Sequence, residues 1–449
     1  MAEATSAAAA ASPIAARPLL LSLLAFQIFM LALLRVAPPA AHLLSWPLFP
    51  KLPAAPSTCN GSLVYVYNLP TQFNSDLIKN CSTINPWVSI CPSLSNAGMG
   101  VALKDPPWPP SEAWYATDQF ATEVIFHNRL QRYPCTTDDP ELATAFFVPF
   151  YAGLAVFRHL FVPDAVQQRD ELSNQLLEWL SRQYYWRRNG GWDHFFVIGR
   201  ITWDFRRLDD TGWGSSFLQL QAMQNTTRLL IERSPWDDQD IGIPYPTSFH
   251  PRQDEDVRQW QDYVRNRTRS NLFGYAGGPR KQFSNDFRQI LLQQCDESGS
   301  CKALDCSNGK CDHPKPVMDL FLDSTFCLQP RGDSFTRRST FDALLAGCIP
   351  VFFWTQSAYI QYYWHLPADP SSYSIFISKD AIKNGTSIKQ VLLDLPEDKL
   401  TAMQSTVAEL IPSIIYANPQ SSFTKTADAF DLAIKGVVNR VTARLYPST

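Results

Sequence analysis

The chain has 449 residues, of which 45% are hydrophobic and 18% are charged, and its net charge at pH 7 is −3. This composition is that of a globular protein, and it excludes a chain that binds nucleic acid or another polyanion through its overall charge. Once about the first 60 residues are set aside, enough chain remains for two domains of ordinary size.

The N-terminal region contains an apolar segment, residues 19–34, broken only by Ser22 and Gln27. A transmembrane helix needs about 20 residues, so the segment must extend past Arg35, whose long side chain can reach the membrane surface. A signal anchor is our first interpretation, and a cleaved signal peptide and a plastid transit peptide are the alternatives. The predicted order is a cytosolic tail at 1–17, a signal-anchor transmembrane helix at 18–37 and a Pro/Ala-rich stem at 38–60.

Cysteines and glycosylation sequons indicate the compartment. All ten cysteines follow the apolar segment, and because paired Cys-x-x-Cys units are absent, we expect local disulfides rather than zinc binding for Cys295, Cys301, Cys306 and Cys311. Five Asn-x-Ser/Thr sequons lie at Asn60, Asn80, Asn225, Asn266 and Asn384. An even number of cysteines together with these sequons favours a secretory lumen, so we expect the folded part of the chain on the lumenal side of the membrane.

Strands and helices alternate in residues 61–252, which we interpret as an N-terminal α/β domain. The predicted strands are 63–69, 145–150, 194–198 and 228–231, and the predicted helices are 115–133 and 164–185. The pattern lapses into turns and aromatic residues over 235–251, so we place a domain boundary at its end.

A second α/β domain is predicted at 253–415. Its predicted helices are 253–269, 285–294, 335–346 and 397–410, and its predicted strands are 272–275, 325–328, 349–353 and 373–377. The remaining residues, 416–449, contain a predicted C-terminal helix at 426–444.

The most informative segment is 323–354, which predicts strand, tight turn, helix and strand. Pro330 and Gly332 mark the turn, Ser334 is a good N-cap, and Gly347 suits the position just past the helix end. Such a βαβ unit implies a parallel sheet.

Arginines gather where this predicted helix begins. Arg337 and Arg338 fall in its first turn, where the helix dipole disfavours each cation by about 0.3–1 kcal/mol. A bound anion explains them, because free backbone N–H groups and guanidinium groups both suit phosphate. Asp342 could accept hydrogen bonds from a ribose; the alternative is an Arg338–Asp342 pair on a solvated face. The predicted nucleotide-sugar site comprises Arg331, Gly332, Asp333, Ser334, Arg337, Arg338 and Asp342.

A lumenal two-domain α/β protein with a diphosphate site suggests a nucleotide-sugar glycosyltransferase that binds its ligands at the carboxyl ends of the strands. Asp238-Gln239-Asp240 and Asp254-Glu255-Asp256 match the Asp-x-Asp metal motif of another architecture, but neither follows a predicted strand. We interpret both as solvated acids. No cofactor and no metal are therefore expected, and the arginines would stabilise the leaving diphosphate.

Six long motifs carry a family resemblance over residues 59–444. They are VYVYNLPTQFN (64–74), WYATDQFATEVIFHNRL (114–130), FFVPFYAGL (146–154), WDHFFVIGRITWDFRR (192–207), SPWDDQDIGIPYPTSFHP (234–251) and FCLQPRGDSFTRRSTFDALLAGCIPVFF (326–353). The chain resembles the plant exostosin-like glycosyltransferases of family 47, in the xyloglucan galactosyltransferase branch.

This resemblance implies two facing Rossmann-like domains of GT-B type, and a type II Golgi membrane protein. It also implies inverting transfer of galactose from UDP-galactose to xylosyl side chains of xyloglucan, in cell-wall polysaccharide synthesis. The expected partners are the UDP-sugar, the xyloglucan acceptor, the Golgi membrane and other cell-wall glycosyltransferases in complexes, without nucleic acid. The alternatives are another donor sugar, such as galacturonosyl or arabinosyl, and a non-catalytic lumenal carbohydrate-binding protein.

An inverting transfer needs a general base near the acceptor hydroxyl, and we expect it from the first domain. Asp204 and His194 are the candidate bases, with Asp193 beside them, because they lie in or just after the third predicted strand. The alternative for Asp204 is a pair with Arg206 or Arg207. Three tryptophans could stack on sugar rings or belong to the core: Trp203, Trp213 and Trp236.

Overall fold

The computed structural model describes residues 59, 62–279 and 286–445. The predicted tail, membrane anchor and all but one residue of the predicted stem lie outside this range, as does the sequon at Asn60. Within the described residues, no helix is both long enough and apolar enough to cross a membrane.

The first sheet is entirely parallel and, in the described part of the chain, has six strands in the order β4-β1-β5-β6-β7-β8. Its central strands are apolar and fully buried, which is why the sequence predicts them. β4 and β8 were not predicted. The strands are β1 (Val64–Val66), β4 (Thr136–Thr137), β5 (Ala145–Phe147), β6 (His194–Ile201), β7 (Thr227–Glu232) and β8 (Asp240–Gly242).

Helices from both ends of the chain cover this sheet. The C-terminal helix, α16 (Ala429–Leu445), returns to it, and Phe430 and Val437 pack in one cluster with Phe147 and Phe195 of the sheet. The other helices of this half are α2 (Ser75–Lys79), α3 (Cys91–Leu94), α4 (Thr122–Leu130), α5 (Ala152–Leu160), α6 (Val166–Ser181) and α7 (Tyr184–Asn189).

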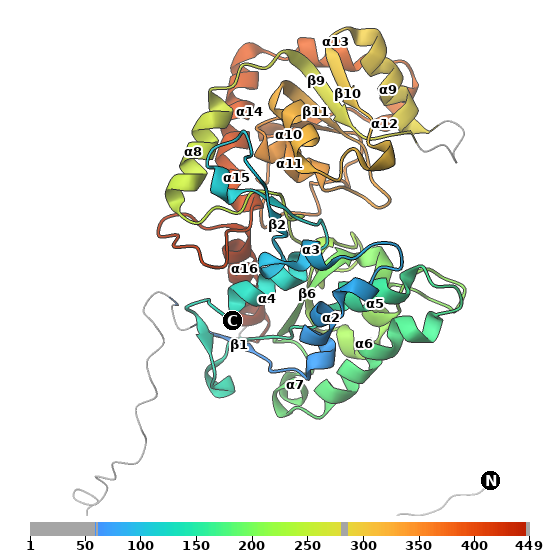
Figure 1. The fold of residues 1–449 in the computed structure, drawn as a ribbon, viewed down its shortest axis with the longest axis vertical. Coiled ribbons are helices and arrows are strands. Elements are labelled where there is room, and N and C mark those ends of the chain that lie inside the picture. The colour runs from blue at the N-terminus through green and yellow to red at the C-terminus, as the bar shows by residue number, and fades with distance from the viewer. Residues whose placement is uncertain (1–58, 60–61, 280–285, 446–449) are drawn as a thin grey trace, which may run out of the picture. The chain divides into compact units, whose positions relative to one another are not determined.

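The second sheet is also parallel, with five strands in the described residues in the order β10-β9-β11-β12-β13. The strands are β9 (Asn271–Ala276), β10 (Cys301–Leu304), β11 (Ser324–Gln329), β12 (Ile349–Phe352) and β13 (Ile375–Phe376). The predicted boundary at residue 253 falls between the last strand of the first sheet and the first helix of this half (Figure 1).

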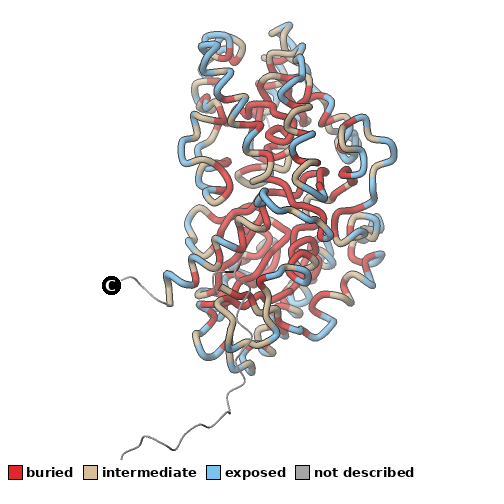
Figure 2. Tube along the Cα trace, turned by 90° about the vertical axis from the view of Figure 1, so that its left-hand side faces the viewer, coloured by how far each residue is buried: buried red, intermediate tan, exposed pale blue. Residues whose placement is uncertain are grey.

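Eight helices accompany the second sheet in the described chain. They are α8 (Asp254–Arg265), α9 (Phe287–Ser298), α10 (Pro314–Leu322), α11 (Ser339–Leu345), α12 (Lys379–Lys383), α13 (Ile388–Leu393), α14 (Glu397–Glu409) and α15 (Ile411–Ile414). Figure 2 shows that buried residues concentrate in the interior and exposed residues on the outside of the molecule. Both halves are therefore α/β layers with a parallel sheet at the centre, as predicted.

A short antiparallel pair, β2 (Val101–Ala102) and β3 (Tyr115–Ala116), replaces the start of the helix predicted at 115–133. α4 begins only at Thr122. Residues 117–121 therefore form a loop between β3 and α4. The aromatic residues that follow Tyr115 gave the whole segment a helical pattern, which concealed this loop.

All ten cysteines pair, and the prediction of local disulfides among Cys295, Cys301, Cys306 and Cys311 is confirmed. The structure adds the pairing, which is Cys295–Cys301 and Cys306–Cys311. They do not share one surface loop, however, because Cys295 is buried in α9 and Cys301 begins β10. The remaining disulfides are Cys59–Cys135, Cys81–Cys91 and Cys327–Cys348.

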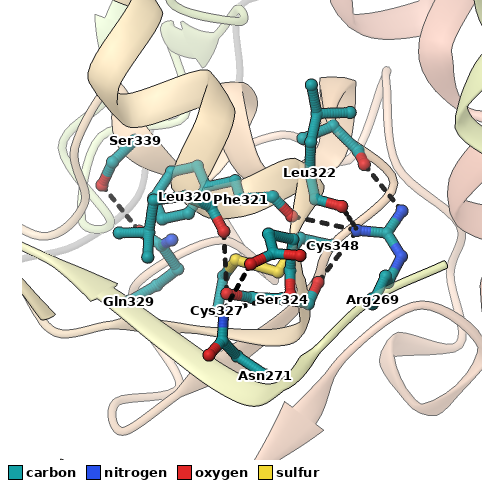
Figure 3. The surroundings of a disulfide bond; sticks show 12 residues. Arg269, Asn271, Leu320, Phe321, Leu322, Ser324, Cys327, Gln329, Ser339 and Cys348 are labelled. Atoms are coloured by element: carbon teal, nitrogen blue, oxygen red, sulfur yellow. Dashed lines mark hydrogen bonds between the residues drawn. A yellow bond between two sulfur atoms is a disulfide. The ribbon is translucent and has the colours of Figure 1, made fainter. Parts of the chain in front are cut away.

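The Cys327–Cys348 disulfide joins β11 to the residue before β12, inside the predicted βαβ unit (Figure 3). Beside it, the Arg269 guanidinium donates hydrogen bonds of 2.9 Å to the carbonyl oxygens of Phe321 and Ser324. The turn into β12 uses Gly347, whose φ of +66° is left-handed and whose added Cβ would lie 2.1 Å from Val264. This confirms the predicted helix-ending glycine.

Candidate functional site

The carboxyl ends of parallel strands meet at one edge of a sheet, where α/β proteins bind ligands. At this edge of the second sheet, residues 330–338 form a loop between β11 and α11. The Gly332 N–H donates to the Thr336 carbonyl at 3.2 Å, and a Cβ on Gly332 would lie 2.5 Å from that oxygen. Only glycine allows this close approach.

The predicted start of the helix is wrong by four residues. α11 begins at Ser339 with Arg338 as its N-cap residue, so Ser334 is not the N-cap. Arg337 and Arg338 therefore lie just before the helix and not inside its first turn.

Glu232, at the carboxyl end of β7 in the first sheet, reaches this loop. Its carboxylate accepts hydrogen bonds from the backbone N–H groups of Phe335 (2.9 Å) and Thr336 (3.3 Å), and from the Tyr245 hydroxyl (2.7 Å). Burial raises the pKa of Glu232 to about 7, against the opposing effect of the Tyr245 hydrogen bond. A carboxylate of the protein thus occupies the N–H groups that we expected to face phosphate.

Sequence analysis missed Glu232. The available signal was an acidic residue directly after the apolar run of the strand predicted at 228–231. Such a residue lies at the ligand-binding edge of a parallel sheet.

Arg338 links the two halves of the fold. Its guanidinium donates to the Thr117 carbonyl (2.6 Å) and to the Ser248 hydroxyl (2.9 Å), and its Nε lies 3.4 Å from a carboxylate oxygen of Asp342. The alternative of an Arg338–Asp342 pair is therefore confirmed, but the face is not solvated, since the Asp342 side chain is only 13% exposed. Burial raises the pKa of Asp342, and Arg338 opposes that rise.

Arg337 points to the carboxyl end of β9. Its Nη2 donates to the Ala276 carbonyl at 2.9 Å, whereas its Nη1 is buried and has no hydrogen-bond partner among the described residues. A buried guanidinium N–H without a partner is costly, and an anionic ligand at this edge would satisfy it.

The other predicted donor-site residues lie near the Arg337 guanidinium, but their side chains do not meet there. Arg331 and Asp333 are exposed, Ser334 is half-buried, and the Arg331 carbonyl accepts a hydrogen bond from Arg288 at 3.1 Å. The structure thus brings Arg337, Arg338 and Asp342 together and places 331–334 in the loop before them.

His194 lies at the opposite edge. It starts β6, has no exposed surface, and its ring stacks on Phe146 at 4.9 Å. Its nitrogens contact the Tyr67 hydroxyl (2.9 Å) and Asp193 (2.7 Å), and burial lowers its pKa. Because ligands bind at the carboxyl ends of the strands, these contacts fit a core residue and not a base.

Asp204 lies just past β6, at the expected edge, but its carboxylate is already engaged. One oxygen accepts from Arg200 Nε at 2.6 Å, the other from the Trp213 indole N–H at 2.8 Å, and the residue is 3% exposed. The expected pairing with Arg206 or Arg207 is corrected to Arg200.

The two Asp-x-Asp motifs are not simply solvated. Asp240 is fully buried between Arg206 (2.7 Å) and Arg228 (2.8 Å), and Asp256 completes the capping box of α8. Asp238 and Glu255 fit the prediction, with side chains 98% and 44% exposed. Over the described ranges, no group of three or more His, Cys, Asp or Glu side chains could hold a metal ion.

Three tryptophans considered for sugar stacking are on the surface. Trp203, Trp213 and Trp236 are 66%, 43% and 82% exposed, so the alternative of a core position is wrong. Trp236 lies beside Phe335 of the loop, with ring centroids 5.7 Å apart.

Comparison with known proteins identifies the family. The exostosin GT47 domain model matches residues 58–392. The chain belongs to the exostosin GT47 family. It is thereby a glycosyltransferase, and the resemblance noted from its motifs is confirmed.

Several curated relatives of this exostosin GT47 chain come from Arabidopsis thaliana. Xyloglucan galactosyltransferase XLT2 is 50% identical over 85% of this chain and 75% of its own length, and xyloglucan galactosyltransferase MUR3 is 46% identical over 86% and 63%. A xyloglucan-specific galacturonosyltransferase is 40% identical over 86% and 58%.

Solved structures give weaker likenesses. The pneumococcal O-GlcNAc transferase GtfA, in complex with UDP and GlcNAc, is 10% identical over 60% of each chain, with a TM-score of 0.30. The glycotransferase of kitacinnamycin is 10% identical over 85% of this chain and 98% of its own, with a TM-score of 0.32. Neither score is high enough to carry an argument.

Proposed function

We propose that this protein is an inverting glycosyltransferase that moves galactose from UDP-galactose onto xylosyl side chains of xyloglucan. The observation that carries the proposal is the 50% identity, over 85% of the chain, to a protein named as a xyloglucan galactosyltransferase. A GT-B architecture, with two Rossmann-like domains facing each other, accompanies this proposal, and the two parallel sheets support it.

The donor diphosphate is proposed to bind at the carboxyl edge of the second sheet, close to Arg337 and Arg338. The unsatisfied Nη1 of Arg337 supports this placement. Negative charge grows on the diphosphate as the sugar leaves, and two guanidinium groups would stabilise it there. Asp342 holds Arg338 in position through their ion pair, and Arg331, Gly332, Asp333 and Ser334 form the adjoining loop.

We further propose that the reaction needs no metal ion, because these arginines supply the positive charge. The proposed location is the Golgi membrane, as a type II protein with its catalytic part in the lumen. The five disulfides and the exposed Asn80, Asn266 and Asn384 support a secretory compartment. Complexes with other cell-wall glycosyltransferases belong to the same proposal.

The deciding experiment incubates the purified full chain with a xyloglucan oligosaccharide and, in turn, UDP-galactose, UDP-galacturonic acid and UDP-arabinose. We expect mass spectrometry to detect one added hexose, with the rate largely unchanged by EDTA. Abolition by EDTA with rescue by manganese would contradict the metal-free reaction.

A second candidate donor is UDP-galacturonic acid, which the 40% identity to a galacturonosyltransferase favours. Addition of a uronic acid in place of a hexose would select it. Xyloglucan binding without any transfer would instead identify a non-catalytic lumenal carbohydrate-binding protein.

A further inference from the structure

Two cavities adjoin each other near the Arg338 side chain. A polar cavity of about 400 Å³ is lined by Thr117, Gln119, Asp312 and Arg338 among others. A more apolar cavity of about 250 Å³ is lined by residues that include Asn85, Val88, Leu154, Phe157 and Arg200. Ser93 and Asp118 line both cavities, so they form the boundary between them.

The backbone at this boundary is held firmly. The Thr117 carbonyl accepts the hydrogen bond from Arg338, and the Thr117 hydroxyl contacts His250 Nε2 at 2.8 Å and donates to the Met99 carbonyl at 2.7 Å. His250 is itself buried. Three hydrogen bonds therefore hold Thr117, the residue before Asp118, in place. One of them comes from Arg338, which belongs to the proposed donor site.

Asp118 presents one engaged and one available carboxylate oxygen. Oδ1 accepts the Phe120 N–H at 2.8 Å, whereas no described residue donates a hydrogen bond to Oδ2 or pairs with it. The side chain is partly exposed. Glu123 is unavailable as a base, because it is buried and accepts N–H groups from Gly153 and Gly199. Asp312 is exposed and lines only the polar cavity, whereas Asp118 lies where the two cavities meet.

Aromatic rings continue from the apolar cavity to the surface. Phe157 lines the cavity, and its ring lies 5.9 Å from that of Phe161. Phe161 in turn lies 5.1 Å from Trp87 and 5.5 Å from Trp213. Trp87 is 70% exposed, and exposed aromatic faces that continue a cavity suit the apolar faces of sugar rings.

We propose that Asp118 is the general base of the transfer, with the donor sugar in the polar cavity beside Arg338 and the acceptor saccharide in the apolar cavity and on Trp87, Phe161 and Trp213. This inference rests on the proposed glycosyl transfer and extends it to a catalytic residue and an acceptor site.

Asp118 Oδ2 takes the proton from the acceptor hydroxyl while that oxygen forms a bond to the anomeric carbon of the donor. The bond from the anomeric carbon to the diphosphate oxygen breaks, and the electron pair leaves with the diphosphate towards Arg337 and Arg338. Attack from the face opposite the leaving group inverts the anomeric carbon, and Asp118 later releases its proton to water.

Asp118→Asn tests the base. The amide keeps an oxygen for the Phe120 N–H, so the loop should fold, which an unchanged melting temperature would verify. We expect kcat to fall by about 10²- to 10⁴-fold, with UDP affinity unchanged and the acidic limb of the kcat pH profile lost. Asp319→Asn, on the exposed face of α10, is the matched control and should keep wild-type rates.

Activity of Asp118→Asn within tenfold of wild type would overturn the assignment, as would a kcat loss with an unaltered pH profile. In both cases wild-type transfer still supports the proposed function. If the wild type transfers no sugar from any UDP donor, the proposed function and the base both fail.

Trp87→Ala tests the acceptor side. We expect the KM for the xyloglucan oligosaccharide to rise by about 2- to 13-fold, with the KM for the donor and kcat at saturation unchanged. Tyr184→Ala, which removes another exposed ring on α7, is the control. An unchanged acceptor KM in both Trp87→Ala and Phe161→Ala would exclude these rings from the acceptor site.

Discussion

Glu232 connects the first sheet to the loop at residues 330–338 of the second half. Its titration should therefore make the free energy of unfolding depend on pH. Its pKa rises from an ordinary 4.5 to about 7 on folding, because burial disfavours the charged form. The folded protein therefore binds a proton that the unfolded chain has lost between these pH values. The free energy of unfolding should fall as pH rises through this window, by about 3 kcal/mol in all.

Glu232→Gln removes this titration while keeping the size of the side chain. One of its two amide N–H groups can donate to the Tyr245 oxygen, but the second meets no acceptor among the partners of Glu232, which leaves a buried donor unpaired. We expect the variant to be less stable than wild type by about 1–3 kcal/mol at pH 5. By pH 8 this deficit should disappear or change sign, because only the wild type then carries the buried charge.

The assay is denaturant unfolding at pH 5 and pH 8, followed by tryptophan fluorescence. Glu123→Gln provides a comparison. Burial also raises the pKa of Glu123 to about 7, but this residue lies on α4, within the first half of the fold. Glu171→Gln, on the exposed face of α6, controls for the substitution itself. If Glu232→Gln and wild type lose stability equally between the two pH values, the argument about Glu232 is refuted.

Arg337→Ala should lower kcat/KM by about 10- to 150-fold through loss of a charge-assisted contact to diphosphate, and Arg337→Lys should recover part of it in steady-state assays. Replacing Cys327 and Cys348 with serine should lower the free energy of unfolding by about 3 kcal/mol in denaturant titrations. Glycosidase treatment should shift the mobility of the plant-expressed protein. Asn384→Gln should remove one step of that shift, and Asn225→Gln less, since the Asn225 amide already donates to the Gly190 carbonyl.

The α/β organisation was predictable because its strands are strong apolar runs bounded by turn residues. β6 and β12 are fully or almost fully buried, and the sequence places both within a few residues of their observed ends. Local disulfides among Cys295, Cys301, Cys306 and Cys311 were predictable from their close spacing, but the pairing was not, since four cysteines allow three pairings.

The beginning of α11 was not predictable, because a distant residue decides it. Ser334 followed by an apolar residue looks like a helix start, yet the next two N–H groups bind Glu232, 103 and 104 positions away in the chain. β8 was missed for a related reason. An acidic residue such as Asp240 is not expected in a buried strand, and its ion pairs with Arg206 and Arg228 form only in the folded chain.

The sequence could not show whether a candidate base is available, because a strand pattern does not reveal which carboxylate oxygen atoms are already hydrogen-bonded. Asp204 was predicted at the correct edge, but its partners Arg200 and Trp213 are visible only in the folded chain. Asp118 was overlooked because it lay inside a segment predicted to be helical, and the structure shows a loop there.

The Cys81–Cys91 disulfide has a consequence for how acceptor preference can change. It ties together the two ends of the segment that carries Trp87 and several cavity-lining residues, including Asn85 and Val88. The ends stay at a fixed separation, so exposed residues between them, such as Trp87 and Val88, can change without altering the core, whereas Ile84 packs in that core. Exchanging only the exposed residues of 82–90 between relatives should therefore change which saccharide is accepted before it affects folding.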